Sequence, residues 1–334
     1  MVAISESWGV DPQGETVTRV HLSGGGLSAS MLTWGALVQD LRLEGHPHPL
    51  VLGYDVFDHY PVHSPYFGAV AGRFANRIAN GRCAIDGTQH QLDTNFLGKH
   101  TLHGGKQGIG KRNWQIADLG TSHVTFTLTD PAGMMGFPGT CEHVCSYTLK
   151  DDATLHIALT STCDAATIVN LAPHSYFSLD GGDMRDHTLR IDADQYLPVD
   201  DKLIPTGEIV NVEETGFDFR TRRRIGAHEN GVYDHNFCLA NERRPLRDVA
   251  WLREEANGLS MIVATTEPGL QVYTGSKLNT PVPGLAGKPY DAFSGIALEP
   301  QLWPDSPNHE TFPDCVLRPG EQSRQISTFR FERG

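Results

Sequence analysis

The sequence lacks any run of about 20 consecutive apolar residues, the length that a membrane-spanning helix requires. Residues 1–14 contain no apolar stretch flanked by basic residues, so no secretory leader is expected. Basic residues are few: 27 Lys and Arg stand against 40 Asp and Glu, which gives a formal charge of −13. Nucleic acids and anionic membranes attract clustered cations. We therefore expect a cytoplasmic protein that binds neither of them, and a small uncharged ligand suits its charge better.

Cysteine is also sparse, and its positions do not repeat at the spacing of a disulfide framework. The six residues are Cys83, Cys141, Cys145, Cys163, Cys238 and Cys315. Scattered cysteines in a long chain are typical of reduced thiols in the cytosol. No structural disulfide is expected.

Glycine and proline are abundant, with 35 and 20 residues, so the chain turns often. Frequent turns favour many short strands over long helices. Apolar and polar residues alternate with a period of two along the whole sequence, which is the pattern of half-buried strands. Clear cases are residues 40–44, 124–129, 155–160 and 328–332.

Two dipeptides predict hairpin turns. Asp86-Gly87 separates strands at 83–85 and 88–92, and Asn257-Gly258 separates strands at 249–253 and 259–265. Residues 245–256 also fit a helix, because proline stands near their start and apolar residues recur at helical spacing. The Asn-Gly turn that follows favours a strand.

The length of 334 residues leaves the domain count open, since large all-β folds reach this size around one core. No linker, low-complexity tract or repeat interrupts the alternation. We therefore expect one domain over residues 1–334, an all-β, large antiparallel β-sandwich. A large twisted sheet presents a concave face on which a sugar can lie.

Four segments are unusually polar for their apolar surroundings. Taken singly, each has an ordinary explanation: Arg77 as a solvated side chain, His103 as a histidine beside a glycine turn, and Glu299 as an exposed carboxylate. The segments are Gly-Arg-Phe-Ala-Asn-Arg-Ile-Ala-Asn-Gly (72–81), Thr-Leu-His-Gly-Gly (101–105), His-Ser-Tyr-Phe-Ser-Leu-Asp-Gly (174–181) and Ala-Leu-Glu-Pro-Gln-Leu-Trp-Pro-Asp (297–305).

Together these segments resemble the signature segments of the aldose 1-epimerase family. Further matches are Tyr-Asp-His-Asn-Phe (233–237), Gln-Val-Tyr-Thr-Gly (271–275), Tyr-Leu-Pro-Val-Asp (196–200) and Leu-Ile-Pro-Thr-Gly-Glu (203–208). The resemblance extends from about residue 66 to 320, with the motifs in the same order. It implies a large antiparallel β-sandwich, the galactose mutarotase-like supersandwich, and an isomerase that interconverts the anomers of a free hexose such as galactose or glucose.

The resemblance also implies roles for individual residues. Glu299 becomes the general base and His174 the general acid, with His103 supporting them near the reacting end of the sugar. The substrate-binding residues become Asn76, Arg77, His103, Tyr176, Asp234 and Gln271. One departure is Pro173, because family members often carry asparagine before the acid histidine, and proline removes a backbone donor there.

Anomer exchange explains these residue types. Opening a pyranose requires removal of the C1 hydroxyl proton and protonation of the ring oxygen, so a base and an acid must flank the sugar. A glutamate is ionised at pH 7, and a histidine can hold or release its proton there. Asp234 and Glu299 are expected to favour the protonated form of His174. The scheme creates no hydride, radical or carbanion, so neither metal nor cofactor is expected.

Other ligand sites are weaker hypotheses. Cys141, His143 and Cys145 share one face of a predicted strand and are possible zinc ligands, but no fourth ligand is evident. The glycines at 24–26 and 104–105 indicate turns, since the helix and lysine of a phosphate loop do not follow. Trp34 and Trp303 are expected in the core, although either can face a sugar.

Two rival functions remain open from the sequence. A hexose-6-phosphate 1-epimerase would bind phosphate through the basic run Arg220, Arg222, Arg223 and Arg224, which otherwise is a solvated surface. A non-catalytic carbohydrate-binding protein would lack Glu299 or His174, and both are present. The expected partner is a small aldohexose, and the expected assembly is a monomer or homodimer.

Overall fold

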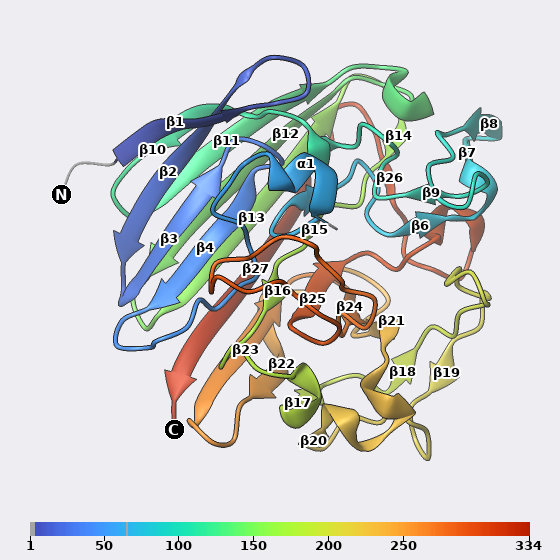
Figure 1. The fold of residues 1–334 in the computed structure, drawn as a ribbon. Helices are drawn as coiled ribbons and strands as arrows, with labels where there is room; N and C mark the ends of the chain where they lie inside the picture. Colours follow the sequence, from blue (N-terminus) through green and yellow to red (C-terminus); the bar gives the residue numbers. More distant parts are fainter. Residues whose placement is uncertain (1–3, 65) are drawn as a thin grey trace.

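The computed structural model describes residues 4–64 and 66–334, and antiparallel strands dominate this part of the chain (Figure 1). The largest sheet has nine strands. In spatial order they are β10 (Gln115–Leu119), β11 (His123–Asp130), β12 (Cys141–Lys150), β13 (Thr154–Cys163), β27 (Ser323–Arg333), β23 (Leu259–Thr265), β22 (Arg247–Arg253), β17 (Thr188–Ile191) and β20 (Arg223–Arg224).

Two further sheets accompany the nine-stranded sheet. The four-stranded sheet consists of β1 (Ile4–Val10), β2 (Thr16–Gly24), β3 (Leu27–Leu32) and β4 (Leu37–Leu43). The six-stranded sheet has the order β16 (Tyr176–Phe177), β25 (Ile296–Gln301), β24 (Gly269–Tyr273), β21 (Asp234–Cys238), β18 (Gln195–Tyr196) and β19 (Val210–Asn211).

The remaining regular structure is short. Four strand pairs connect the sheets: β5 (Val70–Ala71) with β15 (Ala172–Pro173), β6 (Arg77–Ile78) with β9 (Thr101–Leu102), β7 (Arg82–Ile85) with β8 (Thr88–Gln91), and β14 (Thr167–Ile168) with β26 (Val316–Leu317). The α-helix α1 spans His59–His63, and single 3-10 turns lie at Ala79–Gly81, Ile109–Lys111, Met134–Gly136, Met184–Asp186, Ile225–Ala227, Glu229–Gly231 and Ser306–Asn308. No described helix is long and apolar enough to cross a membrane.

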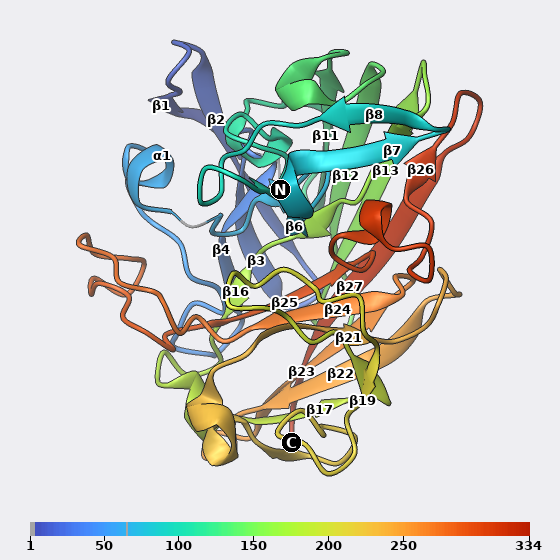
Figure 2. The same ribbon diagram turned by 90° about the vertical axis from the view of Figure 1, so that its right-hand side faces the viewer.

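One hydrophobic core joins the three large sheets. Val20 of β2 and Tyr147 of β12 belong to it, and so do Val263 of β23 and Leu298 of β25. The Tyr147 hydroxyl donates to the backbone oxygen of Ala36 across 2.7 Å, which ties β12 to the turn before β4. Figure 2 shows the four-stranded sheet and the six-stranded sheet beside different parts of the nine-stranded sheet. The predicted antiparallel sandwich is confirmed; the single-domain organisation stays a prediction that this shared core supports.

The predicted hairpins and strands are present. Asp86 and Gly87 have φ values of 50° and 80°, the signature of a type I′ turn between β7 and β8. Residues 247–253 form strand β22, so the strand reading of this region is confirmed, and β22 pairs with β23 beyond Asn257-Gly258.

The two faces of the six-stranded sheet differ in chemistry because side chains alternate along each strand. Leu270 and Val272 of β24 and Leu298 of β25 face the core. Gln271 lies between Leu270 and Val272, and Glu299 follows Leu298, so both side chains lie on the opposite face. The two residues pair directly in the register of β24 and β25. Polar residues thus line one face of a sheet whose other face is hydrophobic.

Candidate active site

Glu299 and His174 lie in contact. His174 Nε2 is 3.5 Å from Glu299 Oε2, and the two residues are only 4% and 2% exposed. Glu299 comes from the middle of β25, whereas His174 follows β15, where its backbone N–H donates to Ala69 O across 2.9 Å. The predicted base and acid are therefore adjacent, and no sugar ring fits between two side chains 3.5 Å apart. Both groups would approach a sugar from the same side.

A second cluster surrounds Asp234, the first residue of β21. Arg77 Nη2 lies 3.2 Å from Asp234 Oδ2, and Gln271 Nε2 donates to Asp234 Oδ1 across 2.6 Å. Arg77 Nη1 also donates to Asn76 Oδ1 across 3.2 Å. The structure therefore brings together four of the predicted sugar-binding residues, all half-buried or buried.

His103 is held against Asn76 by a reciprocal pair of backbone contacts. The Asn76 N–H donates to His103 Nδ1 across 3.1 Å, and the His103 N–H donates to Asn76 O across 2.9 Å. Both residues have left-handed backbones, with φ of 62° at Asn76 and 49° at His103. Non-glycine residues in this region are strained, and such strain concentrates at functional sites. The imidazole of His103 lies 5.1 Å from that of His174 between ring centroids.

Tyr176 and the two tryptophans occupy different surroundings. Tyr176 is buried in β16 with its ring stacked on His174 at 5.1 Å, so it packs against the predicted acid. Trp34 and Trp303 are both buried, and the Trp303 indole N–H donates to Pro268 O across 3.0 Å. The core position predicted for these tryptophans is confirmed.

Burial controls the protonation of the contacting pair. It raises the pKa of Glu299 well above its usual value and lowers the pKa of His174 to about 4. Burial also lowers the pKa of His103, and the neighbouring charges of His174, Arg77 and Lys111 act in the same direction. The prediction that nearby carboxylates favour the protonated form of His174 is confirmed for Asp234, but this contribution does not decide the net shift. The charge of Asp234 acts in that direction, but removal from water outweighs it.

Pro173 fits the local hydrogen bonding. It pairs with Val70 at the end of the two-residue ladder between β15 and β5. The next residue, His174, supplies both contacts to the neighbouring segment: its N–H donates to Ala69 O, and its carbonyl accepts from the Gly68 N–H across 3.1 Å. The backbone of His174 is therefore held by its own hydrogen bonds to Ala69 and Gly68, and no donor at Pro173 is needed for them.

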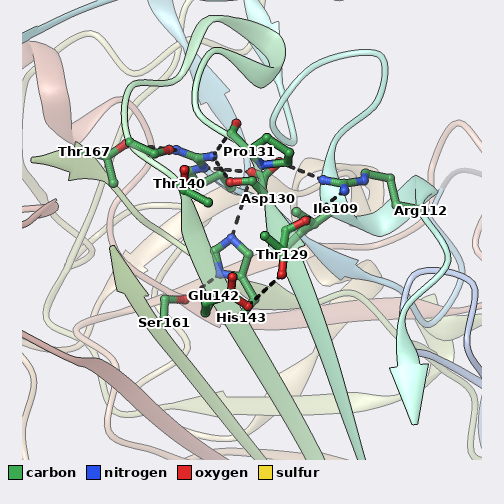
Figure 3. Close-up of polar contacts among 12 residues, drawn as sticks. Ile109, Arg112, Thr129, Asp130, Pro131, Thr140, Glu142, His143, Ser161 and Thr167 are labelled. Carbon is green, nitrogen blue, oxygen red and sulfur yellow. Dashed lines mark hydrogen bonds and ion pairs between the residues drawn. The ribbon is translucent and has the colours of Figure 1, made fainter. Parts of the chain in front are cut away.

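The zinc hypothesis gains no support. Cys141, His143 and Cys145 share the buried face of β12, as predicted. His143 Nδ1 instead lies 2.7 Å from Ser161 Oγ, and its Nε2 lies 4.0 Å from Asp130 Oδ2 (Figure 3). No group of three or more His, Cys, Asp or Glu side chains within residues 4–64 and 66–334 has the arrangement of a metal site. All six cysteines are free thiols.

The arginine run does not form a phosphate site. Arg220 contacts Asp218 at 2.8 Å, Arg224 pairs with Asp186, and Arg223 donates to the backbone oxygen of Gly216. A phosphate bound by Arg220 or Arg224 would have to displace these carboxylates. The phosphate role considered for this run is not supported.

Three residues of the site were missed by the sequence analysis. Tyr66 lies over both histidines, the ammonium of Lys111 lies 4.8 Å from the centre of its ring, and Phe96 lies 5.1 Å below the guanidinium of Arg77. None of them follows a period or motif that points to a site. They reach it from three separate segments: Tyr66 precedes β5, Phe96 precedes β9, and Lys111 ends the 3-10 turn Ile109–Lys111.

Comparison with known proteins identifies the family. The family model described as Aldose 1-epimerase matches residues 18–330, nearly the whole chain. The chain belongs to the aldose 1-epimerase family. Among curated relatives, a galactose mutarotase of Mus musculus is 40% identical over 328 residues, 95% of each chain. An aldose 1-epimerase of Haemophilus influenzae is 37% identical over 322 residues, 92% of this chain and 93% of its own.

Solved structures agree with this membership. An aldose epimerase homologue from C. elegans is 31% identical, with a TM-score of 0.88 over 94% of this chain and 98% of its own. A galactose 1-epimerase from Lactobacillus acidophilus is 27% identical, with a TM-score of 0.86 over the whole of both chains. The resemblance, fold class and isomerase activity predicted from the motifs are thereby confirmed: the activity is that of an aldose 1-epimerase.

Proposed function

We propose that this aldose 1-epimerase interconverts the α and β anomers of free aldohexoses, galactose among them, with Glu299 as general base and His174 as general acid. The observation that carries the assignment is the 3.5 Å contact of their buried side chains, next to Gln271, which pairs with Glu299 across β24 and β25. Relatives described as galactose mutarotases favour galactose as one substrate.

Unpartnered buried atoms support a polar ligand at this place. Glu299 Oε2, His174 Nδ1 and Arg77 Nε are all shielded from solvent without a hydrogen-bond partner within the described chain. A buried polar atom without a partner costs free energy, and functional sites are where such atoms persist. A sugar, with a hydroxyl on nearly every carbon, supplies donors and acceptors to several of them at once.

Burial favours the protonation states opposite to those in which Glu299 acts as a base and His174 as an acid. Burial favours a protonated Glu299 and a neutral His174. Transfer of that single proton from carboxyl to imidazole gives the carboxylate and imidazolium that catalysis requires, and the total number of bound protons does not change. Base and acid are therefore supplied together, without either group having to exchange a proton with bulk water.

The reaction then needs two proton transfers. The Glu299 carboxylate accepts the proton of the C1 hydroxyl while the His174 imidazolium donates to the ring oxygen, and the C1–O5 bond breaks to give the open aldehyde. Rotation about C1–C2 presents the other face of the carbonyl. The same transfers in reverse close the ring, while Asp234, Arg77 and Gln271 hold hydroxyls remote from C1.

The two rival functions are less well supported. Two of the four arginines considered for phosphate binding, Arg220 and Arg224, are paired with carboxylates. A non-catalytic protein has no need of a buried carboxyl in contact with an imidazole, which is costly to fold. Comparing kcat/KM for galactose and a hexose 6-phosphate tests the first rival directly.

Substitution of the pair tests the assignment. Glu299→Gln and His174→Asn are each expected to lower kcat by roughly 10²- to 10⁴-fold, the usual share of one acid–base group. Polarimetry of freshly dissolved α-galactose measures this after the uncatalysed rate is subtracted. Glu242→Gln and His228→Asn, at exposed positions, are the controls and are expected to retain full activity. Parental rates in both pair variants would refute the assignment.

We also propose that the enzyme acts in the cytoplasm as a monomer or homodimer. The six free thiols and the acidic charge support this view. Sedimentation of the purified protein at two concentrations distinguishes the two assemblies.

A further inference from the structure

Tyr66 lies at the edge of the catalytic pair, on the segment that leads into β5. Its ring stacks on that of His174 with 5.9 Å between centroids and an interplanar angle of 21°. The same ring is 4.5 Å from that of His103. The Tyr66 ring thus contacts the imidazoles of both His103 and His174.

The hydroxyl of Tyr66 is buried and has no hydrogen-bond partner within residues 4–64 and 66–334. Burial raises its pKa, so it remains a neutral donor at physiological pH. The backbone of Tyr66 is left-handed, with φ of 68°, which is unfavourable for an aromatic residue. A strained backbone that buries an unpartnered hydroxyl beside the reacting groups indicates a contact that only the substrate completes.

The orientation of the sugar in the proposed function indicates which hydroxyl of the substrate completes this contact with Tyr66. His174 serves the ring oxygen, which is bonded to C1 and C5, and Glu299 serves the hydroxyl on C1. The other neighbour of the ring oxygen is C5, which carries the hydroxymethyl group C6 in a hexose. A side chain stacked on His174 is therefore placed to meet C6 rather than the hydroxyls that Asp234 and Arg77 hold.

We propose that Tyr66 is a specificity-determining residue whose hydroxyl binds the C6 hydroxyl of a hexose. This inference rests on the proposed roles of Glu299 and His174. A pentose such as arabinose or xylose lacks C6 and leaves the Tyr66 hydroxyl unpartnered. The enzyme accordingly discriminates hexoses from pentoses at this position.

Solvent lies close beyond Tyr66. A cavity of about 440 Å³ is lined by Tyr66 together with Ser64, Gln107 and Lys111. The ammonium of Lys111 lies 4.8 Å from the centre of the Tyr66 ring. This cation–π contact holds the ring in place between the cavity and His174. Because Tyr66 stands between the two, it also shields the bound hexose from water on the C6 side.

A cycle of two deletions tests the proposal. Tyr66→Phe removes only the hydroxyl of the protein, and 6-deoxygalactose lacks only the C6 hydroxyl of the sugar. Each deletion alone is expected to lower kcat/KM roughly five- to tenfold relative to the parent enzyme with galactose, the size of one lost hydrogen bond. The two deletions together are expected to cost no more than either one, since they remove the same contact.

Polarimetry of the parent enzyme and Tyr66→Phe with both sugars gives the four values. The inference would be overturned if the losses in kcat/KM from the two deletions multiplied, or if neither deletion lowered kcat/KM. A third measurement uses arabinose, and an equal loss from Tyr66→Phe with galactose and with arabinose would also overturn the inference. Tyr196→Phe is the matched control, because Tyr196 stacks on Phe217 at 4.2 Å. This variant is expected to keep the parental kcat/KM with both sugars.

The Glu299 and His174 variants distinguish the two levels of failure. If those variants lose activity as expected while the cycle is multiplicative, only the role of Tyr66 is wrong. If they keep the parental rate, the proposed orientation of the sugar fails as well.

Discussion

Glu299 and His174 touch at a depth where removal from water acts on both of them. A lone glutamate would be ionised at pH 7, and a lone histidine partly protonated. In the fold the pKa of the first is raised and that of the second is lowered to about 4, in both cases chiefly by burial. Burial therefore favours a pair that holds one proton, which is the number that a general acid and a general base need between them.

The pH profile of the free enzyme tests this arrangement. Below about pH 4, His174 is protonated while Glu299 keeps its own proton, so the pair holds two protons and neither group can act as a base. The value of kcat/KM is therefore expected to fall as the pH drops through about 4. Above the raised pKa of Glu299, the pair loses its only proton, and kcat/KM is expected to fall again. Polarimetric rates corrected for spontaneous mutarotation measure both limbs. An acid limb near 6.5 would mean that His174 titrates like an exposed imidazole.

Short glycine turns decide the geometry at the scale of the elements. Gly104 follows His103 and has φ of 80°, and a Cβ added there would lie 2.0 Å from the carbonyl oxygen of Gly72. The loop after β9 thus crosses the segment before Asn76 at a distance that only glycine permits. This close approach lies next to the two hydrogen bonds that hold His103 against Asn76.

Gly104→Ala is expected to destabilise the fold and to lower activity, because the backbone that carries His103 must move. Gly87→Ala is the matched control: Gly87 has the same φ of 80°, but nothing lies within 4 Å of its added Cβ. It is expected to cost about 1 kcal/mol from backbone strain alone, with full activity. Urea unfolding and polarimetry of both variants separate the two effects. Equal activity in the two variants would contradict the importance of the crossing.

At the scale of the whole molecule, a buried network of ion pairs links the residues just before Asn76 and Arg77 to the nine-stranded sheet. Arg73 is almost fully buried, and its Nε lies 2.8 Å from Asp130 Oδ2 at the end of β11. Arg112 reaches the other carboxylate oxygen at 2.7 Å, and Figure 3 shows this contact above His143. Arg73 also donates to the backbone oxygens of Pro138 and Gly139 at 2.8 and 2.9 Å. The three residues before Asn76 and Arg77 are thereby anchored to the nine-stranded sheet.

Asp130→Asn is expected to lower the free energy of unfolding by about 3–5 kcal/mol, because it leaves the charge of Arg73 buried without its partner. Asp86→Asn removes a bidentate contact with Arg318 on the surface and is expected to lower the free energy of unfolding far less, because solvent screens an exposed ion pair. Urea unfolding of the two variants gives the comparison. A loss at Asp130 no larger than that at Asp86 would contradict the anchoring role.

The period-two alternation and the Asp86-Gly87 turn determined the class of fold and its antiparallel pairing, because both act within a few residues of the chain. The ordered motifs were enough to identify the family, and they predicted Glu299 and His174 as the base and the acid. Local patterns are read from neighbouring residues, so these features needed no tertiary information.

The tertiary structure alone decided how the groups behave. Burial reversed the expected protonation of His174, the carboxylates around Arg220 and Arg224 removed a phosphate site, and the stack of Tyr66 on His174 appeared from a segment without any motif. These properties depend on distances between residues far apart in the chain and on the exclusion of water. Neither is recorded in a local pattern of residues.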